Sequence, residues 1–185
     1  MACHDCGSPA PSKTFRGEFL SGATIPPDTM GAVGTTHVVN ITNDRMRIQT
    51  RDGVEVSRVT LTSFWSGVTI KGAAVSAFDP KVYFDRFNGR FILISSFNGV
   101  SVNSGAGFAV SQTSDPTGLW NRFPVVADPL STGGAGGAGK WIDYPTVGFN
   151  NNWIVVMENV FTYTCNASAV CSSGGYAGPQ IYALD

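Results

Sequence analysis

One pattern occurs three times along the chain, and this repetition constrains the fold more than any other feature of the sequence. Each copy contains an aspartate next to or near a proline, a short apolar segment, a turn and a second apolar segment. The copies begin at Asp28, Asp79 and Asp143. Their spacing of about 50 to 65 residues is typical of proteins built from a repeated unit of four antiparallel strands.

Further strand-like segments follow each copy. Segments 45–50 and 54–59 flank an Asp-Gly turn, a strong hairpin signal, and segments 107–112 and 119–123 flank a second turn. Segment 180–184 is the expected third strand of the last copy. The sequence therefore predicts an all-β fold, a β-propeller segment of about three four-stranded antiparallel blades with the last incomplete. After an N-terminal tail over 1–18, the partial propeller is expected over 19–185, with blades at roughly 26–62, 77–127 and 141–185.

The composition agrees with short strands and excludes two classes of function. The chain has 22 glycines and 10 prolines, and its hydrophobic fraction of 43% is enough for a packed core. The net charge of −1 argues against a nucleic-acid binder, which needs a basic face, and against a polybasic membrane-surface protein. No apolar run approaches the roughly 20 residues of a membrane-spanning helix, so no membrane insertion is expected.

A partial propeller would leave apolar blade faces open. Closed propellers typically need four to eight blades, and solitary soluble domains avoid large exposed apolar faces. We therefore expect this chain to be a fragment that adjoins the remaining blades of a longer chain or of another subunit.

The four cysteines form two close pairs. Cys165 and Cys171 flank a short loop without histidine, which favours a local disulfide over a metal site. Cys3 and Cys6 enclose His4, and this spacing is compatible with half of a zinc site. Whether the two cysteines instead form disulfides, and with which partners, stays open. No signal peptide is visible, yet the disulfide and the Ser/Thr/Asn/Gly-rich polar residues favour a secreted or cell-surface protein.

Four segments in order resemble a known family. Residues 25–34 (IPPDTMGAVG), 79–85 (DPKVYFD), 110–120 (VSQTSDPTGLW) and 143–148 (DYPTVG) are similar to segments of uncharacterised secreted bacterial β-propeller proteins. The resemblance runs from about residue 19 to 185 and implies the propeller fold. It implies no activity, because the family has no agreed function.

Segment 113–120 also shows a looser resemblance to the Asp-box of sialidase-type propellers. One extra residue before Gly118 and Leu119 in place of threonine depart from that pattern. The Asp-box is a structural turn, so the resemblance implies that Asp115 accepts backbone hydrogen bonds and that Trp120 packs between blades.

The three repeated aspartates are the main candidate site. If they occupy the same repeat position at the start of each innermost strand, Asp28, Asp79 and Asp143 converge on one mouth of the central channel. Carboxylates brought together repel one another unless a cation or a proton relieves the charge, and calcium prefers oxygen ligands of this kind. The other interpretation is that each aspartate caps a turn beside its proline.

Two functions follow as hypotheses, with a purely structural module as a third. A binding or scaffold module would take a carbohydrate or protein ligand. Its sugar-binding rim would be lined by aromatic rings, with Trp141 and Tyr144 as the main candidates beside Trp65 and Phe149. The other interpretation is that these rings pack between blades. A glycoside hydrolase, sialidase-like or like five-bladed glycosidases, would use two of Asp28, Asp79 and Glu158, about 5–10 Å apart. The hallmark sequences of those enzymes, and an arginine triad, are absent.

Overall fold

The computed structural model describes residues 7, 10–19 and 25–185. Its strands form three larger antiparallel sheets, each a meander in chain order, and one short hairpin. The first sheet contains β1 (Met30–Val33), β2 (His37–Ile41), β3 (Arg45–Thr50) and β4 (Glu55–Thr60). The second contains β7 (Ala77–Asp85), β8 (Arg90–Phe97), β9 (Gly105–Ser111) and β10 (Trp120–Val126). The third contains β11 (Ala138–Phe149), β12 (Ile154–Cys165) and β13 (Cys171–Leu184).

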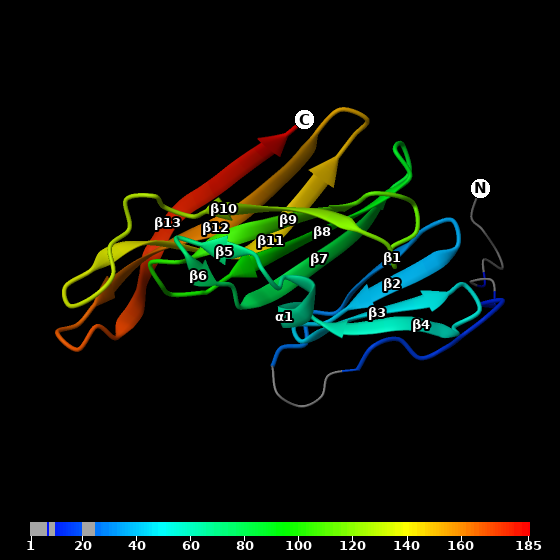
Figure 1. Cartoon of the computed structure of the whole chain (residues 1–185), viewed down its shortest axis with the longest axis horizontal. Helices are drawn as coiled ribbons and strands as arrows, with labels where there is room; N and C mark the ends of the chain where they lie inside the picture. The colour runs from blue at the N-terminus through cyan, green and yellow to red at the C-terminus, as the bar shows by residue number, and fades with distance from the viewer. Residues whose placement is uncertain (1–6, 8–9, 20–24) are drawn as a thin grey trace.

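The predicted all-β class is confirmed. One four-residue helix, α1 (Leu61–Phe64), and the hairpin β5 (Thr69–Ile70) and β6 (Ala73–Ala74) connect the first sheet to the second. Figure 1 shows the first sheet, blue to cyan, at one end of the molecule and the third, yellow to red, at the other, with the green second sheet between them. The described part of the chain contains no helix long and apolar enough to span a membrane.

The first strand of each sheet lies beside the first strand of the next. β1 contacts β7, and β7 contacts β11. These three strands therefore bring one end of each sheet together, and this junction positions the candidate site described below.

The core consists of two clusters, one on each face of the second sheet. Phe91 and Leu93 of β8 belong to the cluster shared with the first sheet, whereas Ile92 and Ile94 belong to the cluster shared with the third. Successive side chains of a strand point to opposite faces, so the continuous apolar run in β8 serves both clusters. Each such side chain contributes about 1.5–3 kcal/mol by leaving water.

Local turn chemistry agrees with the Asp-box resemblance. Asp115 Oδ1 accepts the backbone N–H of Thr117 at 2.9 Å, and the Trp120 indole N–H donates to the Pro116 carbonyl at 3.0 Å. Trp120 also meets the ring of Phe64 edge to face, with 5.3 Å between centroids. The turn thus aims an aromatic side chain into the core between the first two sheets.

The predicted disulfide between Cys165 and Cys171 is confirmed, and it joins β12 to β13. Cys3, Cys6 and His4 lie outside the described residues. Trp65, suggested for a sugar-binding rim, is instead a fully buried core residue whose indole donates to Ser95.

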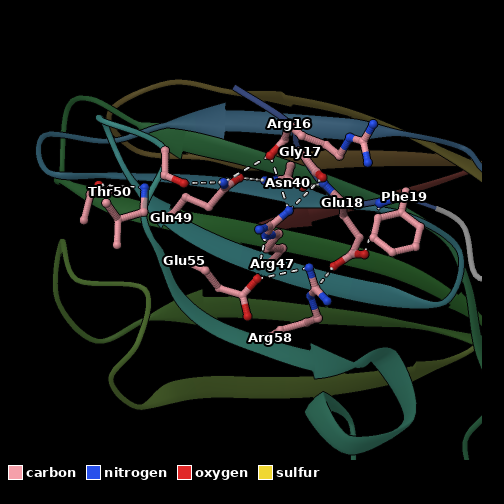
Figure 2. A network of polar contacts seen from close by, with 12 residues as sticks. Arg16, Gly17, Glu18, Phe19, Asn40, Arg47, Gln49, Thr50, Glu55 and Arg58 are labelled. Carbon is pink, nitrogen blue, oxygen red and sulfur yellow. Dashed lines mark hydrogen bonds and ion pairs between the residues drawn. The ribbon is translucent and has the colours of Figure 1, made fainter. Parts of the chain in front are cut away.

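The outer faces of the two end sheets differ in chemistry. Residues 16–19 lie along the outer face of the first sheet and close a polar network on it (Figure 2). Arg47 donates to the Gly17 carbonyl at 2.9 Å, and Arg58 pairs with the buried carboxylate of Glu18 at 3.1 Å. The third sheet instead exposes apolar side chains, among them Met157 and Ile181, which face each other across β12 and β13.

Candidate functional site

Three aspartates from three different sheets meet at the junction of the first strands. Asp28 immediately precedes β1, Asp79 lies in β7 and Asp143 lies in β11. The carboxyl of Asp79 is within hydrogen-bonding reach of the carboxyls of both Asp28 and Asp143. The structure therefore brings together the three residues that the repeat pattern singled out.

The backbone shows that the repeat alignment of the third aspartate is off by one residue. Asp28 and Asp79 have left-handed φ values of 45° and 46°, but in the third sheet the left-handed residue is Tyr144, at 58°. The strand register also breaks at 79–80 in β7 and at 144–145 in β11. Tyr144, and not Asp143, is thus the backbone equivalent of the other two aspartates, and Asp143 reaches the junction from the preceding position.

Asn43, in the loop between β2 and β3, connects the first two carboxyl-bearing segments. Its side-chain amide donates to the Asp28 carboxylate and to the Pro26 carbonyl, the latter at 3.0 Å. Its Oδ1 accepts the backbone N–H of Asp79 at 2.6 Å. Asn43 therefore fixes the position of Asp28 relative to Asp79, a role that no sequence motif indicated.

Glu158 of β12 adds a fourth carboxyl. It is fully buried, its Oε2 accepts from the Ser96 hydroxyl at 3.0 Å, and its Oε1 has no hydrogen-bond partner. The negative charges of Asp143 and Asp79 act on it, as does the positive charge of Lys81. The Lys81 ammonium lies 4.2 Å from the centre of the Tyr144 ring, a cation–π geometry. We call Asp28, Asp79, Asp143 and Glu158 the carboxyl cluster.

Two members of the carboxyl cluster, Asp79 and Glu158, have raised pKa values. Burial, followed by the neighbouring carboxyls of Asp28 and Asp143, raises the pKa of Asp79 to about 7. Burial raises the pKa of Glu158 to about 8; Asp143 and Asp79 add to the effect, while Ser96 and Lys81 oppose it. Protons can thus supply the charge relief that crowded carboxylates require.

The predicted calcium site is not present as a ready-made group. Across the described residues, no set of three or more His, Cys, Asp or Glu side chains is arranged to hold a metal ion. Calcium at Asp28, Asp79 and Asp143 stays a prediction, and its binding would compete with the proton that Asp79 holds near neutral pH.

The catalytic residues named from the sequence all lie in the carboxyl cluster, and their catalytic role stays a prediction. Asp79 interacts directly with Asp28 and, in the same way, with Asp143. Glu158 is fully buried and is not among the described residues that line the groove beside Trp141, whereas Asp143 is one of them.

That groove lies between the start of β7, the loop after β8 and the middle of β11. It has a volume of about 630 Å³, and Trp141, Phe78 and Asp143 are on its wall. Phe161 stacks on the Trp141 ring at 5.1 Å, and the Trp141 indole N–H donates to Ser173 at 3.0 Å. The indole is therefore held in place at the groove, whereas Tyr144 lies outside it with its ring against Lys81.

The opposite wall of the groove is a well-bonded loop. The side chain of Asn98 accepts the Ser76 N–H at 2.7 Å and donates to the Asn103 carbonyl at 2.9 Å. The Ser104 hydroxyl accepts the N–H of Ile142 in β11 at 3.1 Å. These bonds tie the loop to both neighbouring strands, so the groove is preformed. This loop was not predicted as part of a site, because its Asn and Ser residues form no motif.

Comparison with protein-family models, with curated proteins and with solved structures finds no match, so the function of this chain has to be inferred from the geometry of the groove and the carboxyl cluster.

Proposed function

We propose that this chain is an extracellular β-propeller binding module that binds carbohydrate in the groove beside Trp141. The observation that carries the proposal is the lining of the groove. It combines the aromatic surfaces of Trp141 and Phe78 with hydroxyl, amide and carboxylate groups of Ser76, Asn103 and Asp143. Sugars present apolar C–H faces and rings of hydroxyl groups, so a preformed concave site with these two kinds of surface suits them.

The arrangement of the sheets supports the propeller part of the proposal. Three antiparallel meanders follow one another along the chain, and their first strands lie side by side. Both faces of the second sheet are covered by the neighbouring sheets. Successive blades of a propeller have this relation to one another.

The disulfide supports the extracellular part. Disulfides persist in oxidising compartments and are rare in the reducing cytosol. The bond between Cys165 and Cys171 closes a hairpin of the third sheet and is consistent with a secreted or cell-surface protein.

A glycoside hydrolase is the second candidate, and one observation favours it. Asp79 holds a proton near neutral pH and lies within hydrogen-bonding reach of Asp143, which borders the groove. A carboxyl with a pKa near the working pH is suited to general acid catalysis. Asp143 would then be the carboxylate nearest the substrate.

Binding is tested by calorimetric titration of the purified chain with a panel of soluble oligosaccharides. We expect Trp141→Ala to weaken binding at least tenfold, because stacking on the indole is lost. Trp153→Ala is the matched control, since Trp153 is a partly exposed tryptophan away from the groove. Unchanged affinity in the Trp141 variant, or equal losses in both, would contradict the proposal.

Two further measurements separate the accompanying hypotheses. Release of reducing ends from bound oligosaccharides, lost in Asp143→Asn, would support hydrolysis, whereas binding without release would leave a binding module. Calcium at the carboxyl cluster should raise the unfolding midpoint at pH 8, where fewer protons compete, more than at pH 5. The absence of any calcium-dependent shift would remove the ion from the proposal.

A further inference from the structure

We infer that the groove beside Trp141 selects sugars that carry a free amine, such as glucosamine oligomers, over neutral and acidic sugars. This inference rests on the proposed carbohydrate binding and adds the chemical class of the ligand.

The charge on the groove wall is the first observation. The described residues that line it include one carboxylate, Asp143, and no lysine, arginine or histidine. An acidic sugar would therefore meet a negative charge without a basic partner, whereas an ammonium group would meet a carboxylate.

The charge behind the wall is the second observation. Asp143 is backed by Asp79, Asp28 and the fully buried Glu158, whose Oε1 has no hydrogen-bond partner. Lys81 is the cation whose charge acts on Glu158, and its ammonium lies over the Tyr144 ring, outside the groove. A cation in the groove therefore meets the Asp143 carboxylate, and no basic side chain among the residues that line the groove competes with it.

Burial is the main cause that raises the pKa of Asp79 and of Glu158, and neighbouring carboxyls add to it. Asp143 is the carboxyl of the cluster that lines the groove, so it is the one that a cation in the groove can approach.

The third observation is the placement of the aromatic ring. Trp141 and Asp143 are two residues apart on β11 and pair with Phe161 and Asn159 of β12, so their side chains emerge on the same face of the sheet. Two residues of a strand span about 6.6 Å. One sugar ring can therefore stack on the indole while an amine on that ring or its neighbour reaches the carboxylate. An indole also attracts a nearby cation through its ring face.

The test compares four oligosaccharides of equal length in calorimetric titrations: a glucosamine oligomer, its N-acetylated counterpart, a neutral glucose oligomer and an oligogalacturonate. At pH 6 and low salt we expect the glucosamine oligomer to bind at least tenfold more tightly than the neutral and acetylated forms, and the acidic oligomer to bind most weakly. We expect the preference to shrink as salt is added.

Variants locate the effect. Asp143→Asn should bring the affinity for the glucosamine oligomer down to the affinity of the same variant for the neutral oligomer. Asp52→Asn, which removes an exposed carboxylate on a turn of the first sheet, should leave the preference for the amine intact. A lysine tetramer serves as a non-sugar cation and should bind at least tenfold more weakly than the glucosamine oligomer. Circular dichroism of each variant establishes that it is folded.

The outcomes separate this inference from the proposed function. Equal affinity for amine-bearing and neutral sugars, both lost in Trp141→Ala, would overturn the inference and keep carbohydrate binding. A preference that survives in Asp143→Asn, or that disappears equally in Asp52→Asn, would also overturn it. Equal binding of the lysine tetramer would show simple attraction of cations and overturn it too. Absence of binding by every sugar would refute both.

Discussion

The first and third sheets differ in the chemistry of the face that points away from the core. Both sheets have one face in the core and one face turned away from it. On the first sheet the outer face carries Arg47, Gln49 and Arg58, and an N-terminal segment of the same chain satisfies them. On the third sheet the outer face carries exposed apolar side chains, with Ile181 59% exposed. A polar sheet face therefore needs partners of defined geometry, whereas an apolar face needs only to be covered.

The polar network on the first sheet depends most on the ion pair between Arg58 and Glu18. Replacing Arg58 by Ala leaves the carboxylate of Glu18, whose side chain is 1% exposed, without its cation. Because an unpaired buried charge is costly, we expect the free energy of unfolding to fall by about 3 kcal/mol. Urea denaturation measures it.

Arg51→Ala, on an exposed turn of the same sheet, is the matched control and should change stability little. Adding Glu18→Gln to Arg58→Ala should recover part of the loss. If Arg58→Ala proves as neutral as the control, the network on the first sheet contributes nothing to stability.

The carboxyl cluster between the sheets should make the stability of the chain depend on pH. The raised pKa values, about 7 for Asp79 and about 8 for Glu158, mean that the folded chain binds protons more tightly than the unfolded chain. The stabilisation is complete below about pH 4 and is lost as the pH rises through 7 and 8. We expect the free energy of unfolding to fall steadily as the pH rises from 5 to 8 and to level off by pH 9.

Equilibrium denaturation across this pH range measures the effect, and Glu158→Gln or Asp79→Asn should flatten the curve. Each amide removes a group that must lose a proton at high pH, so each variant should be more stable than the original chain at pH 9. If the free energy of unfolding of both variants fell with pH as steeply as that of the original chain, the titrating groups would be other residues.

Substitutions at exposed apolar residues on the outer face of the third sheet should change stability least. Met157 is 38% exposed on the outer face of the third sheet, so Met157→Thr together with Ile181→Thr should change stability by less than about 0.5 kcal/mol. Met46→Thr, at a buried methionine of the first sheet, should cost about 2–4 kcal/mol. Sedimentation velocity adds a second readout, because the double variant should self-associate less than the original chain. A large loss of stability in the double variant would show that this face is already buried in solution.

The sequence predicted the elements whose residues favour the strand state by themselves. The Asp-Gly turn at 52–53 and the alternating segments around it are examples, since turn chemistry and side-chain alternation both act locally. The length of β13 was missed because residues 172–179 contain Ser, Gly and Pro, which have low strand propensity. Pairing with β12 and the disulfide at its start override that propensity.

The candidate site was predictable only in part. The repeat pattern identified Asp28, Asp79 and Asp143, because a repeated unit places equivalent positions close together. The left-handed Tyr144 shifted the third copy by one residue, and side-chain identity alone does not show such a shift. Asn43 and Ser96 belong to no motif, and their roles depend on segments brought together only by folding.

The double-sided burial of β8 has a consequence for how the molecule unfolds. Phe91 and Leu93 lose their contacts if the first sheet detaches, and Ile92 and Ile94 lose theirs if the third sheet detaches. Neither end sheet can open without exposing half of the same strand to water, so the two clusters should melt in a single cooperative transition. The amide protons of β8 should accordingly be among the slowest in the chain to exchange with solvent, and their exchange should require global unfolding.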